Sequence, residues 1–138
     1  MPDPVDQPRE AEELSLSAIL MLERHPNEAA FVWSLVHDIM RLDLWLWHED
    51  DYGHALHLLS YSRFRLILLD STFAPRLSLR TLIRRIQAVA RGTPVILRLP
   101  PEALPPNPDP RIYGVAAVVS KCVGGPTERA IRQTLGLT

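Results

Sequence analysis

The sequence predicts an α/β fold: a doubly wound, five-stranded parallel sheet with helices on both faces. Short apolar segments alternate with segments of helical periodicity along most of the chain. Four of the apolar segments are nearly continuous, which is typical of strands buried on both faces. The fifth, from Leu42 to Trp47, alternates leucine with Asp or Trp, which is typical of an edge strand. Right-handed crossovers then favour the strand order 2-1-3-4-5, which places this segment at an edge.

The first half of the chain contains three of the predicted strands and two helices. The first strand is Ala18 to Leu22, the second is the edge segment, and the third runs from Arg65 to Asp70. Asn27 is a suitable N-cap for the first helix, whose apolar residues recur at helical spacing. The second helix begins near Tyr52, after three acidic residues that favour a helix start.

The second half predicts two more strands, two helices and a proline-rich connection. Ser78 is a suitable N-cap for the third helix, which Gly92 ends. The fourth strand runs from Pro94 to Leu99. Six prolines between positions 100 and 110 then replace the expected fourth helix, because proline fixes φ and removes a donor, so at most one helical turn can form. The fifth strand is Val115 to Lys121, and Pro126 suits the first turn of the last helix.

Composition limits the function classes. The chain has 138 residues and a formal net charge of −1, so one domain is expected, with no general attraction for nucleic acid or membrane. Residues 1–14 predict a flexible acidic tail, and residues 15–138 predict the folded domain. A single cysteine, Cys122, excludes an internal disulfide, and no secretion signal or membrane-spanning stretch is present, which favours the cytoplasm.

Two predicted strands end on charged residues that suggest phosphoryl chemistry. Asp70 closes the third strand, and Lys121, the one lysine of the chain, closes the fifth. The carboxyl ends of parallel strands form one edge of the sheet, where Glu23 and Arg24 also follow the first strand. A carboxylate can accept a phosphoryl group and an ammonium can neutralise its oxygens. The alternative is that Asp70 caps a turn and Lys121 is simply exposed.

These residues resemble a known family, the receiver domains of two-component response regulators. The resemblance covers roughly residues 17–137. It depends on the strand-end aspartate of Leu66-Ile67-Leu68-Leu69-Asp70, the segment from Gly114 to Lys121, the stretch Leu20 to Pro26, and Thr93-Pro94-Val95-Ile96. The order and spacing of these segments carry the resemblance, since none of them is specific alone.

The resemblance implies a signalling module and not an enzyme. It implies that Asp70 is the phosphoacceptor, that Lys121 contacts the phosphate, and that Glu23 belongs to the acidic pocket. The implied partner is a sensor histidine kinase or another signalling protein, with Mg²⁺ held by acidic residues that include Glu23 and Asp70. A homodimer is a further alternative for the partner.

Several positions depart from the family pattern. Arg24 stands where the family has its second acid, so Glu23 and Asp70 face two cations, which weakens any Mg²⁺ site. We expect Arg24 to take the place of the ion and to form a charge-assisted bond with Asp70. Leu99 replaces the hydroxyl residue at the end of strand four, and Val118 replaces the aromatic residue of strand five. Cys122 replaces the proline that follows the lysine.

The sequence leaves three functions open. The first is a receiver-like domain of two-component signalling with Asp70 as its phosphoacceptor. The second is a pseudo-receiver, which acts without phosphorylation as a protein-interaction or dimerisation module. A third, a flavodoxin-like enzyme or cofactor-binding protein, lacks a glycine-rich loop that could wrap a phosphate.

Other clusters have ordinary structural interpretations beside functional ones. The histidines and acids of residues 48–57 could bind a transition metal, or could form a solvated loop and helix start. The arginines of the third helix could bind phosphates, or could be its solvated face. Cys122 is interpreted as a structural thiol. Trp45 and Trp47 share one face of the edge strand, where core packing is expected; exposure would instead indicate an interaction surface.

Overall fold

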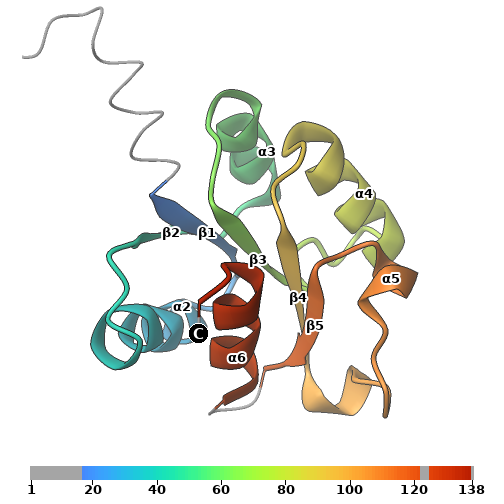
Figure 1. Cartoon of the computed structure of the whole chain (residues 1–138). Helices are drawn as coiled ribbons and strands as arrows, with labels where there is room; N and C mark the ends of the chain where they lie inside the picture. The colour runs from blue at the N-terminus through green and yellow to red at the C-terminus, as the bar shows by residue number, and fades with distance from the viewer. Residues whose placement is uncertain (1–16, 122–124, 138) are drawn as a thin grey trace, which may run out of the picture.

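A computed structural model describes residues 17–121 and 125–137 and contains one five-stranded sheet (Figure 1). All neighbouring strands are parallel, in the order β2-β1-β3-β4-β5, so the predicted sheet and strand order are confirmed. The strands are β1 (Ala18–Leu22), β2 (Trp45–Glu49), β3 (Leu66–Asp70), β4 (Val95–Leu99) and β5 (Ala117–Ser120).

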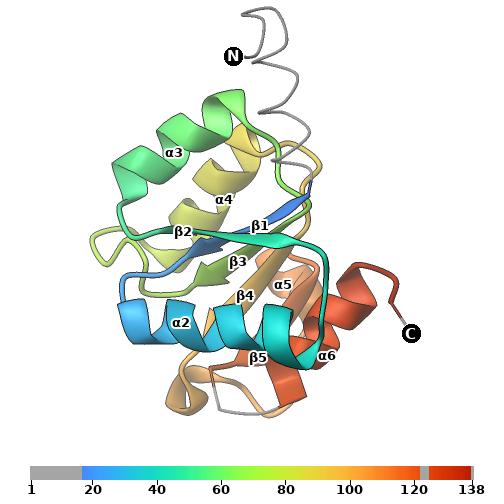
Figure 2. The same ribbon diagram turned by 90° about the vertical axis from the view of Figure 1, so that its left-hand side faces the viewer.

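Helices cover both faces of the sheet, as predicted (Figures 1 and 2). One face carries α2 (Pro26–Ser34), its π-helical continuation η1 (Leu35–Ile39) and α6 (Gly125–Thr134). The other face carries α3 (Tyr52–Tyr61) and α4 (Leu79–Val89). The chain passes from β1 to β2 in one direction along the sheet and from β2 to β5 in the other, so right-handed crossovers place α2 on one face and α3 and α4 on the other.

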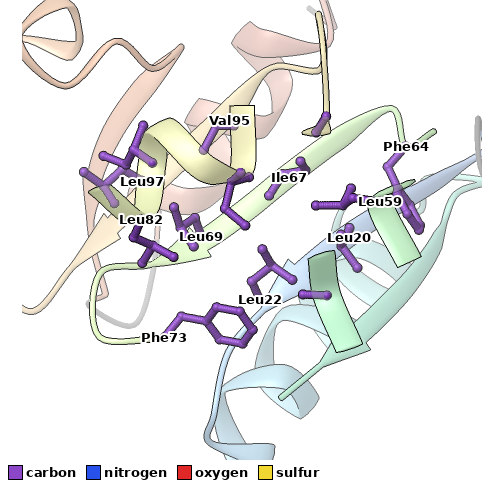
Figure 3. Packing of buried hydrophobic residues seen from close by; sticks show 14 of the residues in the cluster. Leu20, Leu22, Leu59, Phe64, Ile67, Leu69, Phe73, Leu82, Val95 and Leu97 are labelled. Atoms are coloured by element: carbon purple, nitrogen blue, oxygen red, sulfur yellow. The ribbon is translucent and has the colours of Figure 1, made fainter. Parts of the chain in front are cut away.

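Each inner strand supplies side chains to two separate cores because strand residues alternate between faces. On the α3/α4 side, Leu20 and Leu22 pack with Ile67, Leu69 and Leu97 (Figure 3). On the α2/α6 side, the alternate residues of the same strands form the second core, which includes Ile19, Met21, Leu66, Leu68 and Ile96. The face to which a charged residue in β1, β3 or β4 points therefore follows from its parity, that is, from whether it lies an even or an odd number of residues from a core residue of known face.

The helix starts follow local capping. Ser78 accepts a hydrogen bond from the Thr81 N–H at 3.2 Å, which confirms it as the N-cap of α4. Asp51 accepts from the His54 N–H at 2.9 Å and starts α3. The prediction of Asn27 as a cap was wrong. The helix begins earlier, at Pro26, because proline suits the first helical position, and extended His25 occupies the N-cap.

The edge strand is shifted from the predicted segment 42–47 to Trp45–Glu49. Pairing sets the shift, since β2 joins β1 in the register Ala18 to Trp45 through Leu22 to Glu49. Leu42, Leu44 and Leu46 pack on the α2/α6 core, as their alternation indicated. The core packing expected for the opposite face was wrong: Trp45 is 65% exposed and Trp47 is 46% exposed. The helices of that face pack over the inner strands and leave these rings uncovered.

The proline-rich connection contains only short helical turns. These are η2 (Pro101–Ala103) and α5 (Pro110–Tyr113), so the predicted loss of the fourth helix is confirmed. Gly114 ends α5 in the left-handed region at φ 70°, where glycine has no steric cost. No helix in the described ranges is long and apolar enough to cross a membrane. The predicted tail, residues 1–14, and Cys122 lie outside the described residues.

Candidate functional site

The carboxyl ends of three strands bring Glu23, Asp70 and Lys121 together. Glu23 directly follows β1, Asp70 is the last residue of β3, and Lys121 directly follows β5. Glu23 has the parity of Met21, and Asp70 that of Leu68, so both carboxylates point to the α2/α6 side. The Lys121 N–H donates to the Leu99 carbonyl at 2.9 Å, which fixes the backbone from which the lysine reaches across β4.

The Lys121 ammonium lies between the two carboxylates. Its Nζ is 3.2 Å from each Glu23 oxygen and 3.1 Å from Asp70 Oδ1. The Glu23 and Asp70 side chains are 0% and 1% exposed, and that of Lys121 is 14% exposed. The contacts with Glu23 are hydrogen bonds, whereas the contact with Asp70 is an ion pair, because Asp70 Oδ1 has no hydrogen-bond partner in the described residues. Little water screens ion pairs at this depth. One cation therefore holds two buried acids.

Neighbouring groups complete the environment of both carboxylates. The Thr72 hydroxyl donates to Asp70 Oδ2 at 2.7 Å, and the His25 N–H donates to Glu23 Oε1 at 3.4 Å. His48 Nε2 lies 2.6 Å from the Glu23 carbonyl oxygen, which ties β2 to the end of β1. The two acids are thus fixed by side-chain and main-chain contacts on several elements.

Burial controls the ionisation of Glu23. Desolvation raises the pKa of its carboxyl above the ordinary value of 4.5, and the negative charge of Asp70 raises this pKa further. The Lys121 ammonium and its hydrogen bonds, with that of the His25 N–H, oppose the shift. The net direction is upward, so the proton is held more tightly at Glu23 in the folded chain than in the unfolded one.

The expected bond between Arg24 and Asp70 is not formed. Arg24 is exposed and lines a surface pocket with Tyr52 and Phe73, on the α3 side. It makes no ion pair with any residue in the described ranges. The physical reason is parity: Glu23 points to the α2/α6 side, so the next residue points away from it. Lys121 occupies the place beside Asp70 that we had expected Arg24 to fill.

The structure adds a cation that the sequence interpretation missed, Arg98 of β4. It is the register partner of Asp70 on the neighbouring strand, has the parity of the α2/α6 side, and is 1% exposed. Its Nη2 is 3.2 Å from Glu28 Oε2 of α2. Within the described part of the chain, Nε and Nη1 have no hydrogen-bond partner, nor does the buried Thr127 hydroxyl of α6. The available signal was an arginine inside an otherwise apolar strand.

The donors at this edge do not suit Mg²⁺. Such an ion needs several anionic or neutral oxygens around it. Both acids are already bonded to the Lys121 ammonium, and the position of a third acid is taken by the outward-pointing Arg24. The described residues contain no group of three or more His, Cys, Asp or Glu side chains that could hold a metal.

The second cluster of candidate metal ligands, in residues 48–57, has structural roles in this fold. His48 contacts a main-chain carbonyl, and Asp51 caps α3 with His54 nearby at 3.9 Å. His57 contacts the Tyr61 ring edge-on, with centroids 5.2 Å apart. This arrangement is the one expected for a helix start with a solvated face.

The two positions matched to switch residues are buried in the α3/α4 core. Leu99 is 4% exposed and Val118 is 8% exposed, and both pack in the same cluster as Leu97. Neither side chain has a polar atom. They contribute packing beside the acidic site and cannot donate a hydrogen bond to it.

Comparison with solved structures identifies the fold. A response regulator receiver domain from Methylobacillus flagellatus superposes with a TM-score of 0.67 at 14% identity, over 87% of this chain and 99% of that one. The fold is that of receiver domains. The receiver domain of a sensor histidine kinase from Pseudomonas aeruginosa gives a TM-score of 0.66 at 19% identity, over 86% of this chain and 97% of that one, and holds a magnesium ion in its active-site cleft.

A third receiver protein, from Burkholderia phymatum, gives a TM-score of 0.67 at 14% identity, over 88% of this chain and 96% of that one. A scan of protein-family models and a search of curated proteins each found no match. The chain thus shares the receiver fold with these structures at only 14 to 19% sequence identity.

Proposed function

We propose that this chain is a receiver-like signalling domain that acts through protein contacts, with its two buried acids paired to Lys121. The observation that carries the proposal is the Lys121 ammonium, which donates hydrogen bonds to Glu23 at 3.2 Å and forms an ion pair with Asp70 at 3.1 Å. The fold supports a signalling role, and the site supports one that is independent of phosphorylation. In this role the domain is not an enzyme, and it works in the cytoplasm.

Burial of Asp70 argues against rapid phosphoryl transfer. A phosphoryl donor must bring its phosphorus in line with a carboxylate oxygen. The Asp70 side chain is 1% exposed, its Oδ2 accepts a hydrogen bond from Thr72, and its Oδ1 lies against Lys121. An approaching donor would have to displace these contacts, and no suitable Mg²⁺ ligand set in the described residues would offset the charge it brings.

The apolar switch positions support the same conclusion. A phosphoryl group on Asp70 would need a donor at the end of β4 to report its presence, and Leu99 supplies none. Val118 packs in the core and has no ring to reorient. Neither of these two side chains could therefore respond to a phosphoryl group on Asp70.

The second candidate function is a phosphorylated receiver that takes its phosphoryl group from a sensor histidine kinase. One observation favours it: Lys121 Nζ is 3.1 Å from Asp70 Oδ1, so the ammonium could neutralise a phosphoryl group formed there. The two functions make opposite predictions about the chemistry of Asp70.

Treatment with acetyl phosphate, and separately with beryllofluoride, each with Mg²⁺, distinguishes them. We expect the intact mass to stay unchanged after acetyl phosphate and the Asp70 amide resonance to stay in place with beryllofluoride. The matched control is Asp70→Asn, which cannot form an acyl phosphate. A gain of one phosphoryl mass that is lost in Asp70→Asn would overturn the proposal in favour of the second function.

A further inference from the structure

We propose that β2 is a self-association strand, through which two copies of this chain pair antiparallel across a two-fold axis. The two five-stranded sheets would join edge to edge into one continuous sheet. This inference adds a partner to the proposed function but does not depend on the chemistry of Asp70. Sedimentation tests the self-association, and the mass of the acetyl-phosphate-treated chain tests the proposed function.

The outer edge of β2 is open. Within the described residues β2 pairs only with β1 and ends the sheet, and Figure 2 shows it on the near side, between α3 and α2. The Trp45 N–H donates to the Ser17 carbonyl at 2.9 Å, and the Glu49 carbonyl accepts from the Glu23 N–H at 3.1 Å. Odd-numbered residues thus bond to β1. The even-numbered residues Leu46 and His48 direct their main-chain groups outward, because these alternate along a parallel strand.

β2 lacks the features by which proteins usually protect an edge strand. Proteins commonly protect such edges with very short strands, charged residues (especially lysine), proline or a bulge, and β2 has only Glu49 at its end. The sequence of β2 is Trp-Leu-Trp-His-Glu, with continuous register to β1 over all five residues. An edge that is apolar, regular and unblocked is the kind that another strand can extend.

The exposed face of β2 is aromatic and held in place. Trp45 and Trp47 lie on the same face and are 65% and 46% exposed. The Trp47 ring contacts Phe64 edge-on, with centroids 6.1 Å apart, and its Nε1 donates to Glu49 Oε1 at 3.2 Å. A tryptophan fixed before binding loses little side-chain entropy when it is covered, so it can act as an anchor.

The hydrogen-bond pattern suits a second copy of the same strand. Placing the two-fold axis at Trp47, the middle residue, overlaps the full length of both strands. Leu46 then lies opposite His48 of the second copy, and these two residues can exchange both main-chain hydrogen bonds. Trp47 meets Trp47 of the second copy at the closer, non-hydrogen-bonded position, where aromatic pairs interact well.

Charge at the two ends of the sheet also favours self-pairing. The carboxyl end of β2 carries Glu49, followed by exposed Asp50 and Asp51. At the amino end of the sheet, Arg41 and Arg65 are exposed, before β2 and β3 respectively, and outnumber the exposed Asp43 that lies between Arg41 and β2. An antiparallel two-fold arrangement brings the acidic end of each copy toward the basic end of the other, which a parallel arrangement would not do.

The test measures the mass of the full chain by sedimentation across the micromolar range. We expect a reversible dimer, and we expect Trp47→Lys to weaken its Kd by at least about 100-fold, since lysine blocks an edge and removes a central anchor. The matched control is Trp33→Lys, because Trp33 is also a tryptophan that is 49% exposed but belongs to α2 and not to the edge strand. It should leave the dimer intact. Circular dichroism shows whether each variant folds.

A cross-link tests the register without weakening the strand by charge. In a chain with Cys122→Ser, Trp47→Cys should form an intermolecular disulfide on mild oxidation, because facing residues in a non-hydrogen-bonded pair have suitable Cα separations of about 4.5 Å. Trp33→Cys, with the same Cys122→Ser change, should form no intermolecular disulfide. A parent chain that is monomeric throughout, or a Trp47→Lys variant that dimerises as the parent does, would overturn the proposal and assign the exposed tryptophans to a different partner.

Discussion

Lys121, which is partly buried, and Arg98, which is fully buried, are two cations near the carboxyl ends of one sheet, and their partners differ. Lys121 is bonded to two carboxylates that are themselves buried. Arg98 is bonded to one carboxylate, that of Glu28, whose side chain is 32% exposed, and two of its nitrogens have no partner in the described residues. A buried charge is stabilised by the number and depth of its partners. The difference predicts that the two cations contribute unequally to stability.

The largest expected effect is that of Lys121→Met. It leaves Glu23 and Asp70 buried beside each other with no ammonium between them, so we expect the free energy of unfolding to fall by about 3 to 5 kcal/mol at neutral pH. Urea unfolding measures this change. Arg24→Met is the control, because Arg24 is exposed and unpaired within the described residues, and should cost under about 0.5 kcal/mol. Equal losses in both variants would contradict the assignment of Lys121 as the central cation.

The next effect is that of Glu28→Gln, which removes the charged partner of Arg98. We expect a loss of about 1 to 3 kcal/mol in the free energy of unfolding, because the guanidinium stays buried with only a neutral neighbour. Thermal and urea unfolding both report it. Glu128→Gln is the matched control: it breaks the partly exposed pair with Arg132 at 3.2 Å on α6, and should cost about 0.5 kcal/mol or less. If Glu128→Gln lowers the free energy of unfolding as much as Glu28→Gln does, then the burial of Arg98 does not make its ion pair more important to stability than a partly exposed pair.

Arg98→Met sharpens the comparison. Methionine keeps an apolar stem of similar length, removes the two unpartnered nitrogens and lets the half-buried Glu28 turn toward water. We expect the free energy of unfolding to change by less than about 1 kcal/mol, well below the effect of Lys121→Met. A loss as large as that of Lys121→Met would mean that the Arg98 charge is needed by Asp70 as well, and the two cations would then form one site.

The smallest expected effect is on pH dependence, through Glu23. The folded chain binds the Glu23 proton more tightly than the unfolded chain, since burial raises this pKa above 4.5. Stability contributed by this group is therefore present at low pH and is lost as pH rises through the raised pKa. Relative to Glu23→Gln, the parent should become less stable as pH rises above about 4.5. Unfolding at a series of pH values measures the free energy of unfolding of both chains. A parent that gains stability relative to Glu23→Gln as pH rises would contradict the assignment.

Much of the fold followed from short-range patterns. Continuous apolar runs such as Leu66 to Leu69 had to be strands buried on two faces, and the alternation near Trp45 predicted an edge. The convergence of Asp70 with Glu23 followed from strand order alone, because parallel neighbours end at the same edge. Topology thus predicted which residues meet before any side chain was placed.

Three predictions were incomplete or wrong for physical reasons. Arg24 was expected beside Asp70 because its position in the chain was considered without its parity, which directs it to the α3 side. The tryptophans were expected in the core because helices were assumed to cover the whole sheet, whereas α3 leaves the face of β2 open. The burial of Arg98 was missed because it depends on tertiary packing, although an arginine inside an otherwise apolar strand was an available signal.

The proline-rich connection between β4 and β5 has a consequence for the unfolded chain. Residues 100–110 hold six prolines, yet form only one short 3₁₀ turn and the start of α5. Each proline restricts the backbone before folding begins, so less disorder is lost when the segment takes its final path, by about 0.4 to 1 kcal/mol at each compatible position. This connection can therefore keep a defined course with few hydrogen bonds, because part of its order is already present in the denatured ensemble.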